Sequence, residues 1–138
     1  MLSNYLERLY IEAKDLKEKN IELALKKVGS GKILLDLGCW DGELTIKWSR
    51  SMSARKVMGI EGVPQAVRLS KKKNIKIYKL DLDKQKWPLK ENSIDCVHSN
   101  LVIEHVSNVD HFISESFRVL KKGGYSIVST NNLSIKIF

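Results

Sequence analysis

Apolar side chains recur every three or four positions through the first 28 residues, with charged residues between them. This spacing predicts amphipathic helix over residues 2–28, because it gathers the apolar side chains on one face. Asn20 separates two halves of the pattern and is a candidate N-cap for the second half. Gly29 and Gly31 end the helix before the next apolar run. Residues 1–30 are therefore expected to form a leading helical segment.

Short apolar runs alternate with helical patterns along the rest of the chain. Five apolar runs predict strands, at residues 33–37, 56–60, 75–80, 94–97 and 125–129. Three patterns predict helices at residues 41–51, from 63 onward and at 108–120. Gly123 and Gly124 are expected to close the last of these helices. Strands that alternate with helices form parallel sheets covered on both faces. We therefore predict a single α/β domain over residues 1–138, a three-layer Rossmann-like parallel sheet in strand order 3-2-1-4-5.

Residues 33–42 read Ile-Leu-Leu-Asp-Leu-Gly-Cys-Trp-Asp-Gly, an apolar run that breaks into an acid and two glycines. This pattern predicts a buried strand, a tight turn and the start of a helix, and such sheets bind ligands at the carboxyl ends of their strands. A turn of this kind often holds a phosphate. Here Asp36, Asp41 and Glu43 would repel a pyrophosphate, and the spacing of Gly38 and Gly42 is not that of a dinucleotide site. A cationic ligand such as S-adenosylmethionine fits better, because it carries a sulfonium and an ammonium group.

Residues 34–42 resemble the cofactor motif of the class I S-adenosylmethionine-dependent methyltransferases. The resemblance continues at the later strand ends and after the last helix, at residues 59–61, 81–82, 94–97, 100–106 and 117–124. It covers residues 32–130, and Trp40 stands where the family usually has a glycine. The surroundings of residues 104–106 and 118–120 are similar to the branch that acts on small molecules and lipid precursors. In this family a leading helix can cover part of the pocket.

The resemblance implies roles for residues at the strand ends. Glu61 comes 25 positions after Asp36, where an acid can accept hydrogen bonds from both ribose hydroxyls of the cofactor. Asp81 would accept a bond from the adenine amino group, and the Leu82 N–H would donate to a ring nitrogen. Apolar walls for the adenine are expected from Ile60, Val63 and Leu101. The predicted cofactor-binding residues are Asp36, Gly38, Cys39, Trp40, Gly42, Glu61, Gly62, Asp81, Leu82, Asn100 and Leu101.

Methyl transfer from a sulfonium is an in-line displacement with a neutral leaving group, so the protein mainly has to hold donor and acceptor in line. If the acceptor is a hydroxyl or a protonated amine, a base helps. His105 is the best-placed imidazole because it follows the fourth predicted strand, although a structural role for it stays open. His98 alternates with strand residues, as a core histidine would, and His111 lies at the start of a helix.

Cysteine usage and hydropathy exclude several classes of protein. Cys39 and Cys96 lack partners at the spacing of a disulfide framework or a zinc site, so we predict no metal. No apolar run approaches the roughly 20 residues of a membrane span. The N-terminus lacks the layout of a signal peptide. We therefore expect a cytoplasmic protein without a membrane span.

The net charge of +8 comes mostly from lysines spread along the chain, with a single run at residues 71–73. A small-molecule acceptor is favoured; an RNA or protein acceptor, and a nucleic-acid partner in general, are left open.

A third alternative is a cofactor-binding module without catalysis, or a fragment, because the resembling family continues with a helix and two antiparallel strands. Without those strands the fifth strand becomes a sheet edge, beside which residues 133–138 add alternating apolar side chains. We expect either a chain cut from a longer protein or a homodimer through this edge.

Overall fold

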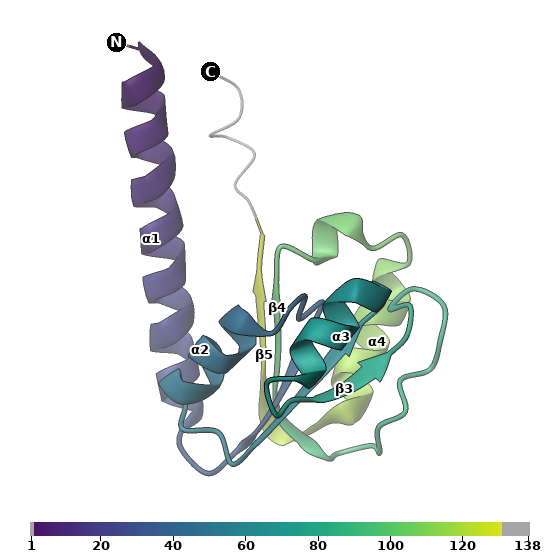
Figure 1. The fold of residues 1–138 in the computed structure, drawn as a ribbon. Helices are drawn as coiled ribbons and strands as arrows, with labels where there is room; N and C mark the ends of the chain where they lie inside the picture. The colour runs from purple at the N-terminus through teal and green to yellow at the C-terminus, as the bar shows by residue number, and fades with distance from the viewer. Residues whose placement is uncertain (1, 131–138) are drawn as a thin grey trace.

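The computed structural model describes residues 2–130, in which five parallel strands form one sheet in the order β3-β2-β1-β4-β5 (Figure 1). The strands are β1 (Ile33–Leu37), β2 (Lys56–Glu61), β3 (Lys76–Lys79), β4 (Ile94–Asn100) and β5 (Leu120–Ser129). Every neighbouring pair runs parallel. The predicted Rossmann-like sheet and its strand order are confirmed.

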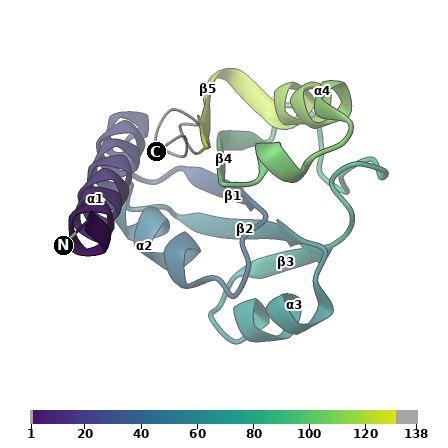
Figure 2. The same cartoon turned by 90° about the horizontal axis from the view of Figure 1, so that it is seen from above.

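Helices cover both faces of this sheet, as Figure 2 shows from above. One face carries α1 (Leu2–Val28), α2 (Glu43–Ser51) and α3 (Pro64–Lys71). The other carries α4 (Val109–Val119), and a short 3₁₀ helix, η1 (Ile103–His105), follows β4. Figure 1 also shows α1 projecting well past the sheet. Within the described residues, no helix combines the length and the apolarity that crossing a bilayer demands.

The core divides into two clusters because successive residues of a strand point to opposite faces. Leu34 of β1 belongs to the cluster with Leu25 of α1 and Trp48 of α2. Its neighbour Leu35 belongs to the other cluster, with Phe112 of α4. These side chains are at most 1% exposed. The two clusters hold the carboxyl ends of the strands at one end of the molecule, where the ligand site is expected.

The predicted division of the leading segment at Asn20 is wrong, because α1 is one continuous helix. Ile21 and Leu25, one helical turn apart, are both buried against the sheet, so the apolar stripe continues in phase. Asn20 itself is exposed. An exposed asparagine costs a helix only part of a kcal/mol, about 0.7 at most, so packing overrides the capping signal.

The predicted end of the last helix at Gly123 and Gly124 is also wrong. α4 ends at Val119, and β5 begins directly at Leu120. Leu120 pairs with Ile94, while Tyr125 pairs with Cys96, so residues 121–124 bulge out of the sheet. Gly123 adopts φ +75°. The glycines serve this bulge, where a left-handed backbone is needed.

β5 lies at the edge of the sheet and pairs only with β4 in the part of the chain that the structure describes. The predicted association through this edge stays a prediction. The apolar alternation of residues 133–138 lies outside the described residues.

Candidate active site

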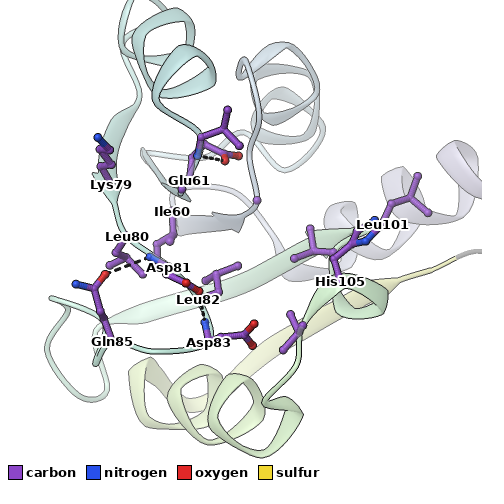
Figure 3. Close-up of a pocket in the computed structure, with 15 residues that line it drawn as sticks. Ile60, Glu61, Lys79, Leu80, Asp81, Leu82, Asp83, Gln85, Leu101 and His105 are labelled. Atoms are coloured by element: carbon purple, nitrogen blue, oxygen red, sulfur yellow. Dashed lines mark hydrogen bonds between the residues drawn. The ribbon is translucent and has the colours of Figure 1, made fainter.

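A cavity of about 670 Å³ opens at the carboxyl ends of the strands. Figure 3 shows Glu61 and Asp81, from the ends of β2 and β3, on one side of it, and Leu101 and His105, which follow β4, on the other. The predicted apolar walls Ile60, Val63 and Leu101 all line it. Of the predicted cofactor residues, those in the lining are Gly38, Glu61, Gly62, Asp81, Leu82 and Leu101.

Glu61 is the most constrained group in this lining. Its side chain ends β2 and the residue is only 6% exposed. Oε2 accepts the Trp40 N–H at 2.9 Å, and Oε1 accepts the Val63 N–H at 2.8 Å. A carboxylate has about four lone-pair positions, so each oxygen keeps one for a further donor. Glu61 is therefore a rigid bidentate acceptor at the cavity wall.

The turn between β1 and α2 passes the cavity through Gly38. Gly38 adopts φ +64°, and a Cβ there would lie 2.6 Å from Val102 Cγ2. Trp40 adopts φ 47°, which explains why the resembling family has a glycine at this position. Gly42 adopts φ +83° as the N-cap of α2. The backbone of the turn thus keeps a left-handed form at the site of the substituted glycine.

Asp36 lies beneath the turn and outside the cavity lining. It is 5% exposed, and it accepts hydrogen bonds from the Thr45 hydroxyl and from His98, whose Nδ1 lies 2.7 Å from Asp36 Oδ1. Asp41 accepts the Glu43 N–H at 3.1 Å. The lining carboxylates are those of Glu61, Asp81 and Asp83. That Asp36 binds the cofactor and that these acids face a bound cation stay predictions.

The other predicted cofactor residues lie around the turn. Cys39 is buried against Gly59, where a Cβ would come 2.6 Å from the Cys39 sulfur. Trp40 is 60% exposed. Asn100 ends β4, and its Oδ1 accepts the Ser129 hydroxyl at 2.7 Å. Direct contacts from these residues to a cofactor stay a prediction.

Asp83 was missed in the sequence and ties two walls of the cavity together. It accepts backbone N–H groups from Ser107 at 2.9 Å and Asn108 at 3.0 Å. These bonds lower the pKa of Asp83. Asp81 accepts the Asp83 N–H and pairs with Lys84 at 3.0 Å, and both contacts lower the pKa of Asp81. The Asp-x-Asp spacing signals a turn, but it cannot reveal a partner 24 residues away.

Of the three histidines, only His105 lines the cavity. His98 is fully buried with its Nε2 lacking a partner among the described residues, and its ring lies 5.8 Å from that of Trp48. His111 Nε2 lies 3.0 Å from the Gln85 carbonyl oxygen. His98 is thus a core residue, as its position in the strand predicts.

The two thiols lie inside the protein and are poor nucleophiles. Burial, followed by the charge of Asp36, raises the pKa of both Cys39 and Cys96 to about 12. Both therefore stay protonated near neutral pH. Across residues 2–130, no three His, Cys, Asp or Glu side chains gather into a group that could hold a metal ion.

Residues 35–128 match a family model described as a methyltransferase domain. The chain belongs to this methyltransferase-domain family. The match runs from β1 into β5 and includes every residue of the cavity lining. The predicted family is confirmed, together with its fold.

Relatives of this methyltransferase domain include two ubiquinone biosynthesis O-methyltransferases. The chain is 29% identical over 136 residues to that of Pelagibacter ubique, covering 91% of this chain and 51% of the relative. It is 33% identical over 113 residues to the mitochondrial enzyme of Rattus norvegicus, and the match covers 75% of this chain and 32% of the relative. The solved structure of an S-adenosylmethionine dependent methyltransferase from Mesorhizobium loti is 25% identical in sequence, with a TM-score of 0.68. The match covers 79% of this chain and 52% of that one. The chain spans about half the length of these relatives, or less.

Proposed function

We propose that this methyltransferase domain binds S-adenosylmethionine in the cavity and transfers its methyl group to a small-molecule acceptor. Glu61 carries the proposal. A buried carboxylate with one free lone pair on each oxygen suits the two adjacent hydroxyls of a ribose. Gly38 lines the same cavity, and a Cβ there would come within 2.6 Å of Val102, another lining residue.

The charge of the lining supports a cationic ligand. Glu61, Asp81 and Asp83 contribute carboxylates, while Lys79 is the only lysine or arginine in the lining. A cleft lined mainly by one sign of charge attracts the opposite sign. Asp81 and Leu82 are proposed to recognise the adenine between the apolar walls. Dinucleotides, whose pyrophosphate is anionic, are disfavoured by the same field.

His105 is proposed as the base of the reaction. S-adenosylmethionine supplies, when bound, a methyl group on a sulfonium, and its transfer leaves a neutral sulfide. A hydroxyl acceptor must lose its proton as the new carbon–oxygen bond forms, and the His105 imidazole is the side chain in the lining suited to take it. The names of the two relatives, both O-methyltransferases, support an oxygen acceptor. A cytoplasmic location stays a prediction.

Calorimetry on Glu61→Ala tests the cofactor. The substitution removes both acceptors, so binding of S-adenosylmethionine and S-adenosylhomocysteine is expected to weaken by about 1.5–3 kcal/mol, the range for hydrogen bonds to a charged group. Glu61→Gln keeps one acceptor oxygen, so its affinity is expected to lie between those of the wild type and Glu61→Ala. Glu12→Ala, an exposed acid of α1, is the control with the same change in charge. Tight binding of NAD, or an unchanged affinity of Glu61→Ala for S-adenosylmethionine, would contradict the assignment of this cofactor to the cavity.

Tryptophan fluorescence gives a second test of the site. Trp40 is 60% exposed, whereas Trp48 and Trp87 are 1% exposed. Since the Trp40 N–H donates to Glu61, a ligand on Glu61 is expected to alter the surroundings of the Trp40 ring. Titration with S-adenosylhomocysteine should therefore change the emission of the wild type, and Trp40→Phe should remove most of that change. An emission change in Trp40→Phe as large as that of the wild type would contradict this expectation.

A further inference from the structure

Lysines and arginines gather at the amino ends of the strands, on the side of the sheet opposite the cavity. In a parallel sheet all strands begin at the same end, which lies at the bottom of Figure 1. Two hollows open there, one between the ends of α2 and α3 and the starts of β2 and β3, the other at the start of β5. We call their cationic residues the basic edge: Lys32, Arg55, Lys56, Lys71, Lys73, Lys76, Lys121 and Lys122.

Most of the basic edge has no counter-charge. Lys73 pairs with Glu43 at 3.0 Å, and Lys121 pairs with Asp95 at 2.9 Å. In the described part of the chain, none of the other cations in the basic edge has an ion pair. Along the sequence only residues 71–73 form a basic run. The fold therefore creates a concentration of positive charge that the sequence does not display.

Stabilisation of helix ends explains only part of this cluster. α2 and α3 end at this edge, and cations near a helix C-terminus offset the helix dipole. Lys71 ends α3 and fits that role. Lys56 and Lys76 instead begin strands, and both side chains are exposed. The helix dipoles therefore do not account for these two lysines, although the Nζ of Lys76 also lies 5.2 Å from the centroid of the Tyr78 ring.

We propose that the basic edge binds the phosphate backbone of nucleic acid. Strands lie about 4.8 Å apart, so the edge from β3 to β5 extends about 19 Å. Phosphates follow one another about every 3.4 Å along the axis of a duplex strand, so the edge spans several of them. An extended polyanion matches this row of charges better than a single small anion does.

Other anionic partners fit the edge less well. Protein interfaces have an apolar core in addition to charge, and stable membrane binding combines a polybasic patch with an apolar or lipid anchor. Among the described residues that line the two hollows, Tyr125 is the exposed large apolar one. A lone exposed aromatic ring also offers little stacking for bases, so we infer contact with phosphates and no reading of sequence. Because the cavity is at the opposite end of the strands, the stretch of nucleic acid on the basic edge is not itself the methyl acceptor.

Fluorescence anisotropy with a short labelled DNA duplex tests the proposal, and it needs no cofactor. Lys56→Glu/Lys76→Glu is expected to weaken binding about tenfold or more, and to reduce the slope of log affinity against log salt by about 2. The control Lys14→Glu/Lys19→Glu makes the same change in net charge on exposed positions of α1, about 21 and 13 Å along the helix from Val28. It is expected to change the affinity by about twofold at most. Thermal unfolding checks that both variants fold.

Several results would overturn the proposal. One is the absence of duplex binding by the wild type, and another is an equal loss in both double variants, which would mean attraction by net charge alone. Preferred binding to vesicles rich in phosphatidylserine would indicate a membrane surface. Equal competition by polyglutamate would indicate an acidic protein. None of these outcomes depends on whether the cavity binds S-adenosylmethionine, so the two proposals fail separately.

Discussion

Arg118→Ala is expected to lower the free energy of unfolding by about 3 kcal/mol, the low end of the cost of leaving one member of a buried ion pair alone, because the Arg118 side chain is 17% exposed. From α4, Arg118 donates to both carboxylate oxygens of Glu115, each at 2.6 Å. It also donates to the carbonyl oxygens of Leu89 at 2.8 Å and Trp87 at 2.9 Å. The Glu115 side chain is 9% exposed. Alanine would remove both guanidinium bonds to this carboxylate, which then keeps only the Trp87 N–H at 2.7 Å, and it would leave the Leu89 carbonyl without its donor.

Urea denaturation measures this loss, with Arg68→Ala as the control. Arg68 is an exposed arginine of α3, and its removal is expected to change stability by about 0.5 kcal/mol or less. A loss in Arg118→Ala no larger than that of the control would show that the pair contributes nothing. The loop from Trp87 to Leu89 leads into β4, so local opening there should also appear as faster amide exchange.

The same pair predicts a dependence on pH. Hydrogen bonds from Arg118 lower the pKa of Glu115 from its ordinary value of 4.5, against the effect of burial. A carboxylate with a lowered pKa in the folded state adds stability that is fully present above its ordinary pKa. That stability disappears as the pH falls through the lowered value. The difference in stability between wild type and Arg118→Ala is therefore expected to narrow below pH 4.5.

Gly38→Ala is expected to lower the free energy of unfolding by about 2–5 kcal/mol and to weaken cofactor binding. A left-handed backbone costs a residue with a Cβ about 1–2 kcal/mol, and crowding a packed site adds about 1–3 kcal/mol. The added Cβ would meet Val102 Cγ2 at 2.6 Å. Val102 also lines the cavity, so any shift that relieves the contact deforms the binding surface.

Gly31→Ala separates the two contributions. Gly31 adopts φ +70°, but a Cβ there meets nothing within 4 Å, so only the backbone cost of about 1–2 kcal/mol is expected. Val102→Ala in the Gly38→Ala background should recover the crowding part, because it removes the methyl groups that the new Cβ meets. Equal losses in Gly38→Ala and Gly31→Ala would refute the contact with Val102. Denaturation and calorimetry on the same samples give both readouts.

Local patterns were sufficient to predict most of the fold. Each strand and helix appears as its own period of apolar residues over a few positions, and crossover handedness restricts how such elements assemble. The errors occur where distant pairing decides the backbone. Gly123 and Gly124 look like a helix end, but the pairing of Tyr125 with Cys96 turns them into a bulge within β5.

The candidate site also has a part that local sequence patterns predict and a part that distant contacts decide. By itself the sequence determined that acids stand at or just after the ends of β1, β2 and β3, and the resemblance to the methyltransferase family was then enough to predict Glu61, Asp81 and the apolar walls. Only the tertiary structure decided which of these groups face the cavity. Asp36 turns away to His98, 62 positions along the chain, and the basic edge joins residues from four strand starts. Side-chain direction and contacts between strands depend on the packed sheet, and no local period of the sequence records them.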